Sequence, residues 1–322
     1  MATASVRGAG GEGVFLSLFL DILLQVTLPI IALVGLGWAT QHRLALDVAS
    51  LNRLLVYVAM PCFLVHYLST ASQPIEEVWP TVYFTVIQFA LLMLLGWVAA
   101  VAFRLPSSYV AVVVLATVYA NVGNFGIPMV KLAFPPEFIL HQSVITSLMT
   151  ILIVTVGVWM LAPATAARGP VARLAAAFET PVLPAVALGL GLRALDWRLP
   201  PILAIPVEMT GSIFAPLALY ALGAQLAASS KGVVRLAPLS LVLALKLVAA
   251  PALTWGLALA LGMPGDMTDL FVVAAATPVG VLLAVFCVEF DRHPRFIASA
   301  ILVSTLLSPL FVTGWILLAR LY

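Results

Sequence analysis

The stretch TVYANVGNFGIPMVKLAF, residues 117–134, combines the apolar character of a membrane helix with a cluster of residues that break helices. The cluster consists of Asn121, Gly123, Asn124, Gly126 and Pro128. Proline removes a backbone donor and clashes with the carbonyl four residues earlier, and glycine lowers the cost of leaving helical geometry. Since unpaired backbone groups are costly in hydrocarbon, the expected break has to face protein or water.

A second interrupted stretch, VVAAATPVGVLLAVF, covers residues 272–286 and contains Pro278 and Gly280. Half-helices that restart near Pro128 and near Pro278 would point their N-terminal ends at the two breaks. Such ends carry free N–H groups and about half a positive charge, so together they favour an anion such as a carboxylate. The C-terminal ends of the preceding halves could instead hold sodium. The alternative for both stretches is a simple kink with close helix packing.

The composition of the whole chain agrees with a membrane location for these stretches. Of the 322 residues, 63% are hydrophobic and 9% are charged, against roughly 25% charged in a soluble domain. This excludes a soluble globular protein and a disordered one. Apolar runs of helical length recur from residue 14 to the C-terminus, which excludes a single anchor and a β-barrel. The fold class is therefore an all-α polytopic membrane protein.

The apolar runs predict ten transmembrane helices. Their ranges are 15–39, 50–69, 78–103, 108–134, 138–161, 179–196, 202–227, 235–261, 266–289 and 295–321. The longest connection, residues 162–178, is rich in alanine, basic, and contains proline. It is expected to be a cytoplasmic linker between a first five-helix repeat, residues 1–161, and a second one, residues 179–322.

Lysine and arginine in the connections indicate the orientation. One side has nine: Arg43, Arg53, Arg104, Arg168, Arg173, Lys231, Arg235, Arg292 and Arg295. The other side has five: Arg7, Lys131, Arg193, Arg198 and Arg320. The side with nine is expected to be cytoplasmic, which places both termini outside. The predicted location is the plasma (inner) membrane, crossed many times.

Prolines repeat in the same order in the two halves. Pro29, Pro61 and Pro128 match Pro184, Pro216 and Pro278, and in each half the first two of these matched prolines are 32 residues apart. A repeat of five spans enters the membrane from opposite sides in its two copies, so the repeats are inverted. Transporters of this kind bind substrate near the midplane, where a broken helix from each half meets the other. Here these are the fourth and ninth spans.

The two interrupted stretches resemble the auxin efflux carrier family, which includes the plant PIN carriers and bacterial malonate or organic-acid permeases. The resemblance lies in NVGNFGIPMVK (121–131), ATPVG (276–280), FCVEFDRHP (286–294) and ILVSTLLSPL (301–310). It covers all ten spans, and the short connection at 162–178 is similar to that of bacterial members.

The resemblance implies an inverted repeat with crossed, discontinuous fourth and ninth spans. This fold is similar to that of bile-acid sodium symporters and sodium/proton antiporters. It also implies a scaffold of spans 1, 2, 6 and 7, a moving transport domain made of the other six spans, and a homodimer. The organic anion differs among family members, so the substrate does not carry over.

Two polar residues lie in the middle of apolar spans. Lys246 is expected to bind a substrate carboxylate, to replace a coupling cation, or to stabilise the helices through a pair or hydrogen bond. Gln88 lies at the corresponding place in the third span and could reach the crossover or bond between helices. The full predicted substrate-binding set is Asn121, Gly123, Asn124, Gly126, Ile127, Pro128, Thr277, Pro278, Val279, Gly280, Lys246 and Gln88.

We expect a transporter of a small organic carboxylate, auxin-like or malonate-like, that works by elevator-type alternating access. Enzyme motifs and a P-loop are absent from the sequence, no metal or other cofactor is expected, and the net charge of +2 gives no reason to expect nucleic acid. Coupling to sodium or protons stays open. The alternatives are a sodium-coupled symporter and a membrane receptor that binds a carboxylate without transport.

Overall fold

The long apolar runs of the chain form helices in the computed structural model. It describes residue 20 and residues 23–70, 75–161, 181–228 and 235–321. Within these ranges, extended chain pairs only at an isolated antiparallel bridge between Ala120 and Val279. Helix is the outcome that hydrocarbon imposes, since it satisfies the backbone groups of a segment internally.

The helices are interrupted by short π-turns, labelled η, and by one 3₁₀ turn, η3. In the first half they are η1 (Leu23–Thr27), α2 (Leu28–Leu44), α3 (Val48–Leu54), η2 (Leu55–Ala59), α4 (Met60–Thr70), η3 (Ile75–Val78), α5 (Trp79–Ala102), α6 (Ser107–Val118), η4 (Val122–Gly126), α7 (Ile127–Ala133), α8 (Phe138–Leu152), η5 (Ile153–Gly157) and α9 (Val158–Leu161). In the second half they are α11 (Val182–Ala194), α12 (Pro201–Ser212), α13 (Phe214–Ala228), α14 (Leu236–Ala244), η7 (Leu245–Ala249), α15 (Ala250–Ala260), α16 (Gly265–Ala276), α17 (Leu282–Glu289) and α18 (Pro294–Leu321).

Six helical segments of the described chain are long and apolar enough to cross a membrane. They are Val48–Thr70, Glu76–Ala102, Phe138–Leu161, Pro201–Ala228, Leu236–Ala260 and Pro294–Ala319. Each lies within two residues of a predicted span at both ends. Of the other four predictions, the first and sixth extend outside the described residues, and the fourth and ninth are broken. A polytopic helical membrane protein is thereby confirmed.

Most of the π-turns have a common cause in the sequence. Four of the five π-turns in the described residues end two positions before a proline. These pairs are Thr27 with Pro29, Ala59 with Pro61, Gly126 with Pro128, and Ala249 with Pro251. Proline cannot donate to the carbonyl four residues earlier and its ring crowds that carbonyl, and a wider turn relieves the clash.

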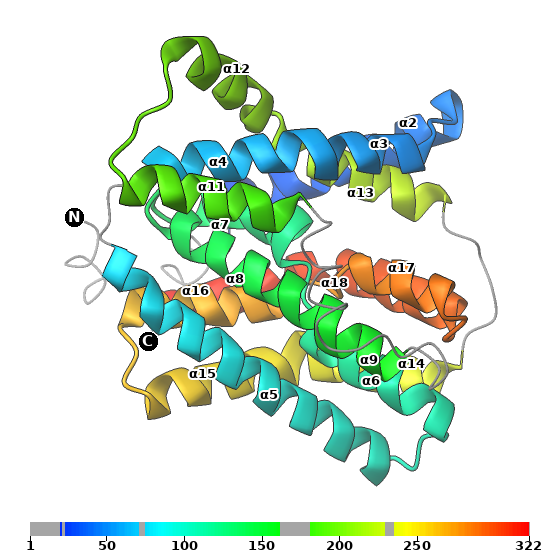
Figure 1. Ribbon diagram of the computed structural model, residues 1–322. Coiled ribbons are helices and arrows are strands. Elements are labelled where there is room, and N and C mark those ends of the chain that lie inside the picture. Colours follow the sequence, from blue (N-terminus) through cyan, green and yellow to red (C-terminus); the bar gives the residue numbers. More distant parts are fainter. Residues whose placement is uncertain (1–19, 21–22, 71–74, 162–180, 229–234, 322) are drawn as a thin grey trace.

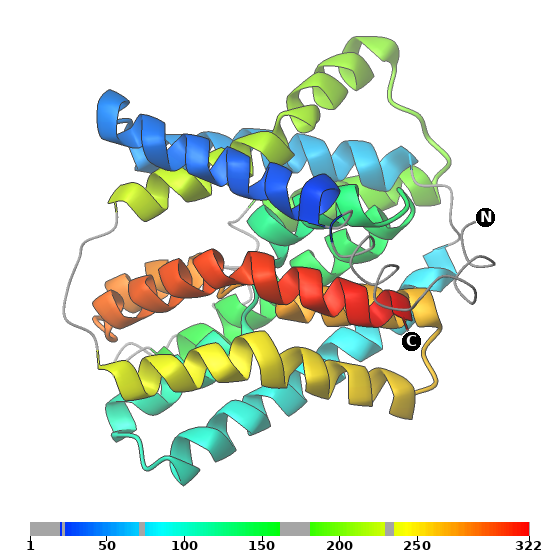
Figure 2. The ribbon, with the colours of Figure 1, turned by 180° about the vertical axis from the view of Figure 1, so that it is seen from behind.

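The helices form two groups. In Figures 1 and 2, an upper group lies above a lower group; the upper group consists of α2, α3, α4, α11, α12 and α13, and the lower group consists of α5, α6 and α14–α18. Within the upper group, α2 packs against α13, and α4 packs against α11 and α12. Within the lower group, α5 packs against α6, α15 against α16, and α16 against α18. Both interrupted stretches are thus placed inside the bundle, and every residue of α16 from Leu270 to Ala276 is buried.

Glycine allows the close approach of α2 and α13. A Cβ atom on Gly37 would collide with the carbonyl of Tyr220, and one on Gly223 would collide with the carbonyl of Val34. A hydrogen bond of 2.7 Å between the hydroxyls of Thr40 and Tyr220 joins the same pair of helices. The upper group is therefore held by backbone-close packing, as is typical of small residues at membrane helix interfaces.

Candidate functional site

Two helices stop inside the bundle instead of crossing it. Helix α6 ends at Val118 and α16 ends at Ala276. The next residues, Tyr119 and Thr277, have extended backbones with ψ angles of 104° and 153°. The predicted interruption of both apolar stretches is therefore present in the structure.

The two extended segments pair with each other. The N–H of Asn121 donates to the carbonyl of Pro278 at 2.8 Å, and the N–H of Gly280 donates to the carbonyl of Tyr119 at 2.9 Å. Each break thus satisfies backbone groups that the other break frees, which is what burial away from water requires.

Side chains of neighbouring helices satisfy further backbone groups at the breaks. The N–H of Val279 donates to the hydroxyl of Ser304 at 3.1 Å. The carbonyl of Val122 accepts from the Gln142 amide at 2.7 Å and from the Thr146 hydroxyl at 3.2 Å. Helices α8 and α18 therefore hold the two segments in place.

The helices restart at different points from those that the sequence predicts. In the first half, helical turns resume at Val122, because the carbonyl of Asn121 accepts the N–H groups of Phe125 and Gly126 at 3.2 and 2.9 Å. The prediction of a restart near Pro128 is wrong, since this proline is the second residue of α7 and follows a π-turn that accommodates it.

In the second half, α17 starts at Leu282, after a turn at Gly280. Pro278 itself lies in the extended segment, whereas Pro128 lies in a helix. The predicted match between these two prolines is therefore wrong. The segment around Pro278 pairs instead with the segment around Ala120.

A cavity of about 200 Å³ lies beside the crossing, between the two helix groups. The upper group contributes Asn52, Val56, Met60 and Gln225. The two breaks and the helices that restart after them contribute Tyr119, Asn121, Val122, Gly123, Asn124, Val281 and Leu282. Helix α8 contributes Thr146 and Thr150. Both helix starts, at Val122 and at Leu282, thus reach the cavity wall.

Among the described residues, the cavity wall offers hydrogen-bond donors and no ionised side chain. The N–H groups of the first turn of a helix have no partner within the helix, and they carry partial positive charge. The side chain of Asn121 is buried, and its amide nitrogen has no hydrogen-bond partner among the described residues. Such a wall suits a carboxylate, whose oxygens accept hydrogen bonds.

The predicted site residues fall into three places. Asn121, Gly123 and Asn124 line the cavity. Gly280 lies against the ring of Tyr119, so closely that a Cβ atom there would collide with it. The structure brings these four residues together at the crossing.

The second place is the packing around the crossing. Gly126, Ile127 and Pro128 are buried in η4 and α7, and a Cβ atom on Gly126 would lie 2.6 Å from the amide nitrogen of Gln142. The Thr277 hydroxyl donates to the carbonyl of its own helix, at Ala274. Together with Pro278 and Val279, these residues lie outside the cavity wall and shape the break.

The third place consists of helix α5 and the segment formed by η7 and α15. Gln88 donates to the Thr254 hydroxyl at 2.7 Å, a buried bond between these helices. Lys246 is fully buried, and its Nζ atom has no hydrogen-bond partner among the described residues. Neither side chain lines the cavity.

Sequence reasoning identified three of the thirteen residues that line the cavity and missed the other ten. Thr146 and Thr150 are four residues apart on α8, and Asn52, Val56 and Met60 follow at the same spacing on the second span. This spacing places each set on one helix face. The spacing thus indicates two helix faces in the sequence. Only the packing of the two helix groups shows that these faces meet the crossing.

Comparison with known proteins agrees with the motifs. The model of a family described as membrane transport protein matches residues 22–175 and again residues 171–316. The probable auxin efflux carrier component 5b of rice, Oryza sativa subsp. japonica, is 34% identical over 104 residues, which cover 32% of this chain and 28% of the rice protein. The match therefore covers less than a third of the length of this relative. The chain belongs to the membrane transport protein family, the family of the auxin efflux carriers.

Proposed function

We propose that this transporter carries a small organic anion with a carboxylate group, and that the anion binds in the cavity at the crossing. The observation that carries this proposal is the cavity wall itself. Two helix starts, at Val122 and Leu282, supply donors, as does the amide nitrogen of Asn121. In the part of the chain that the structure describes, this nitrogen has no partner and no carboxylate side chain on the wall competes with the substrate. The name of the rice relative is consistent with an organic anion.

The proposed architecture is ten spans in two inverted repeats of five. If spans 1 and 6 are equivalent, and spans 2 and 7 likewise, a contact of span 1 with span 7 implies one of span 6 with span 2. Helix α2 of span 1 packs against α13 of span 7, and α11 of span 6 packs against α4 of span 2. The pairs α5–α6 and α15–α16 correspond in the same way. This supports the inverted repeat.

The proposed mechanism is an elevator. The scaffold would consist of the group with α2, α4, α11 and α13, and the moving domain would consist of the group with both broken helices. The cavity supports this because its wall draws on both groups, with Asn52 and Gln225 on one side and Asn121 and Thr150 on the other. Sliding of one group would carry the bound anion past the other.

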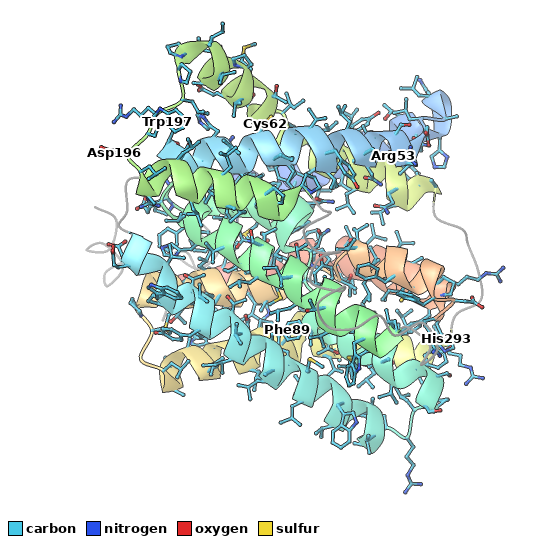
Figure 3. All side chains as sticks on the ribbon, in the orientation of Figure 1. Arg53, Cys62, Phe89, Asp196, Trp197 and His293 are labelled. Atoms are coloured by element: carbon cyan, nitrogen blue, oxygen red, sulfur yellow. The ribbon has the colours of Figure 1, made fainter. Side chains whose placement is uncertain are left out.

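The proposed orientation places the basic end of the bundle in the cytoplasm. Figure 3 shows Arg53 and His293 at one end, and Asp196 and Trp197 at the opposite end. The end with Arg53 is the one to which the sequence assigns nine basic residues. An anion that crosses alone is driven outward by roughly 2.3 kcal/mol per charge per 100 mV of inside-negative potential, whereas an anion that crosses with a cation is not driven in this way.

The proposal is tested by exchange in proteoliposomes. Labelled malonate, benzoate and indole-3-acetate are presented outside vesicles that contain the unlabelled compound, with protein-free vesicles as the control for leakage. We expect protein-dependent exchange of at least one of them, and its loss in Asn121→Ala but not in Ser240→Ala, an exposed position on α14. Saturable binding of all three without exchange would favour a receptor and contradict the proposal.

A further inference from the structure

The apolar span Leu236–Ala260 contains a charged residue type in an unusual turn. Lys246 lies in the π-turn η7, which joins α14 to α15. Pro251 has no N–H to give to the carbonyl of Leu247, and that carbonyl accepts instead from the indole N–H of Trp315 at 2.9 Å. The backbone carbonyl that Pro251 leaves free therefore has a hydrogen-bond partner, whereas the side chain of Lys246 has none among the described residues.

Among the described residues, no group forms a hydrogen bond with the Nζ atom of Lys246. The side chain is 0% exposed, and Nζ has no hydrogen-bond partner. An isolated ammonium in such a place costs far more than a neutral amine, and proteins avoid this cost by releasing the proton. Lysine is suited to this because it gives up its proton when buried, whereas arginine stays charged.

The helices packed against η7 supply no counter-charge at this depth. The helices α14 and α15, which flank η7, contain no ionisable residue. The other helices that pack against η7 are α6, α16 and α18. Their ionisable residues lie at helix ends: Tyr109 near the start of α6, Asp266 and Asp269 near the start of α16, and Arg295 and Arg320 at the two ends of α18. Lys246 lies midway between the ends of its own span.

The position of η7 nevertheless links Lys246 to the site. η7 packs against both α6 and α16, the two helices that end at the crossing, at Val118 and Ala276. A carboxylate in the cavity brings a negative charge to the same crossing. Coulomb attraction falls only with the first power of distance, and a dry interior screens it little. The bound anion is thus the charge that can hold a proton on Lys246.

We propose that Lys246 binds a proton when the carboxylate enters the cavity and releases it when the carboxylate leaves on the other side, so that anion and proton cross together. This inference rests on the proposed function and names its coupling ion. In each cycle the neutral amine takes one proton to become an ammonium and returns as the amine after release. No bond to the substrate forms, and a monocarboxylate crosses with no net charge.

The test uses vesicles in which the membrane potential is clamped at zero with valinomycin and equal potassium. The probe is labelled malonate, because its charge prevents leakage through lipid. With the outside more acidic by about one pH unit, the wild type is expected to accumulate malonate up to about tenfold, the ratio that one coupled proton supports. Lys246→Met and Lys246→Arg are expected to reach a ratio of one.

The control for loss of a lysine is Lys131→Met, since Lys131 is exposed on α7, and this variant should accumulate malonate like the wild type. Exchange at equal pH, measured for every chain, shows that the protein is folded and active. Wild-type exchange without accumulation would overturn the inference and leave the proposed function intact, as would accumulation by Lys246→Met. Absence of exchange of malonate, benzoate and indole-3-acetate in all chains, wild type included, would overturn both.

Discussion

The backbone N–H of Asn121 donates to the carbonyl of Pro278 at 2.8 Å, although the two residues lie in different halves of the chain. The bond joins the two breaks, and its counterpart runs from Gly280 back to Tyr119. Neither broken helix could be buried alone, because its extended segment would keep unpaired groups in an apolar surrounding. The two halves of the site therefore form together or not at all.

Replacing Gly280 by alanine should disrupt this pairing. Its new methyl group would meet the Tyr119 ring and, at 3.1 Å, the carbonyl of Ala120. Overpacking of a tight interior typically costs about 1–3 kcal/mol, so we expect a lower melting temperature of the purified protein in detergent and loss of exchange. The matched control is Gly256→Ala on α15, where no atom lies within 4 Å of the new methyl group. Equal melting temperatures of the two variants would contradict the predicted role of Gly280.

The amide of Asn121 should be required for the anion and not for folding. We expect Asn121→Ala to weaken carboxylate binding about tenfold, as the loss of one hydrogen bond to a charged group implies. Asn121→Asp should weaken it further, because a carboxylate then faces a carboxylate. Equilibrium binding of the labelled anion to the purified proteins in detergent gives both affinities. Binding as tight in Asn121→Asp as in the wild type would exclude this residue from the site.

The bond between Gln88 and Thr254 should serve the packing of α5 on α15. We expect Gln88→Leu to lower stability by about 1 kcal/mol, and the double variant with Thr254→Val to recover part of it, because both polar partners are then removed. Anion affinity should stay at the wild-type value in both, since neither residue lines the cavity. A selective loss of affinity would restore Gln88 to the substrate site.

The ring of His293 should make stability depend on pH. It stacks on the Tyr109 ring, with centroids 3.8 Å apart. Burial lowers its pKa below 6.5, and the nearby Arg235 and Arg292 act in the same direction. Because the folded-state pKa is lowered, this stability is present above pH 6.5 and is lost as the pH falls below it.

His293→Phe retains an aromatic ring for the stack on Tyr109 and removes the titration. We therefore expect the melting temperature of the wild type to decrease more than that of His293→Phe between neutral and mildly acidic pH. The measurement is a pH series of thermal unfolding in detergent. Parallel curves for the two proteins would show that the ring does not titrate in this range.

The spans were predictable from the sequence because hydrocarbon imposes length and apolarity on each of them. Segment Phe138–Leu161 agrees with its predicted range at both ends. The cluster between Asn121 and Pro128 likewise made the first break predictable from the sequence. Its exact position was not, because a π-turn absorbs Pro128 and moves the restart of the helix back to Val122.

Tertiary packing decided the rest of the site. No motif marks Asn52 or Gln225 in the sequence, and only the meeting of the two helix groups places them at the cavity. Gln88 and Lys246 occupy similar depths in the sequence, yet one finds a partner in Thr254 and the other finds none. A sequence pattern locates such groups along a helix, but it does not tell which neighbour they face.

The most direct test of the central claim is a structure of the protein with an iodinated carboxylate, 3-iodobenzoate, measured for anomalous scattering of iodine. The account predicts an iodine peak in the cavity at the crossing, with the carboxylate near the Asn121 amide and the helix start at Leu282. A peak only elsewhere, with protein-dependent exchange of the same compound intact, would contradict it.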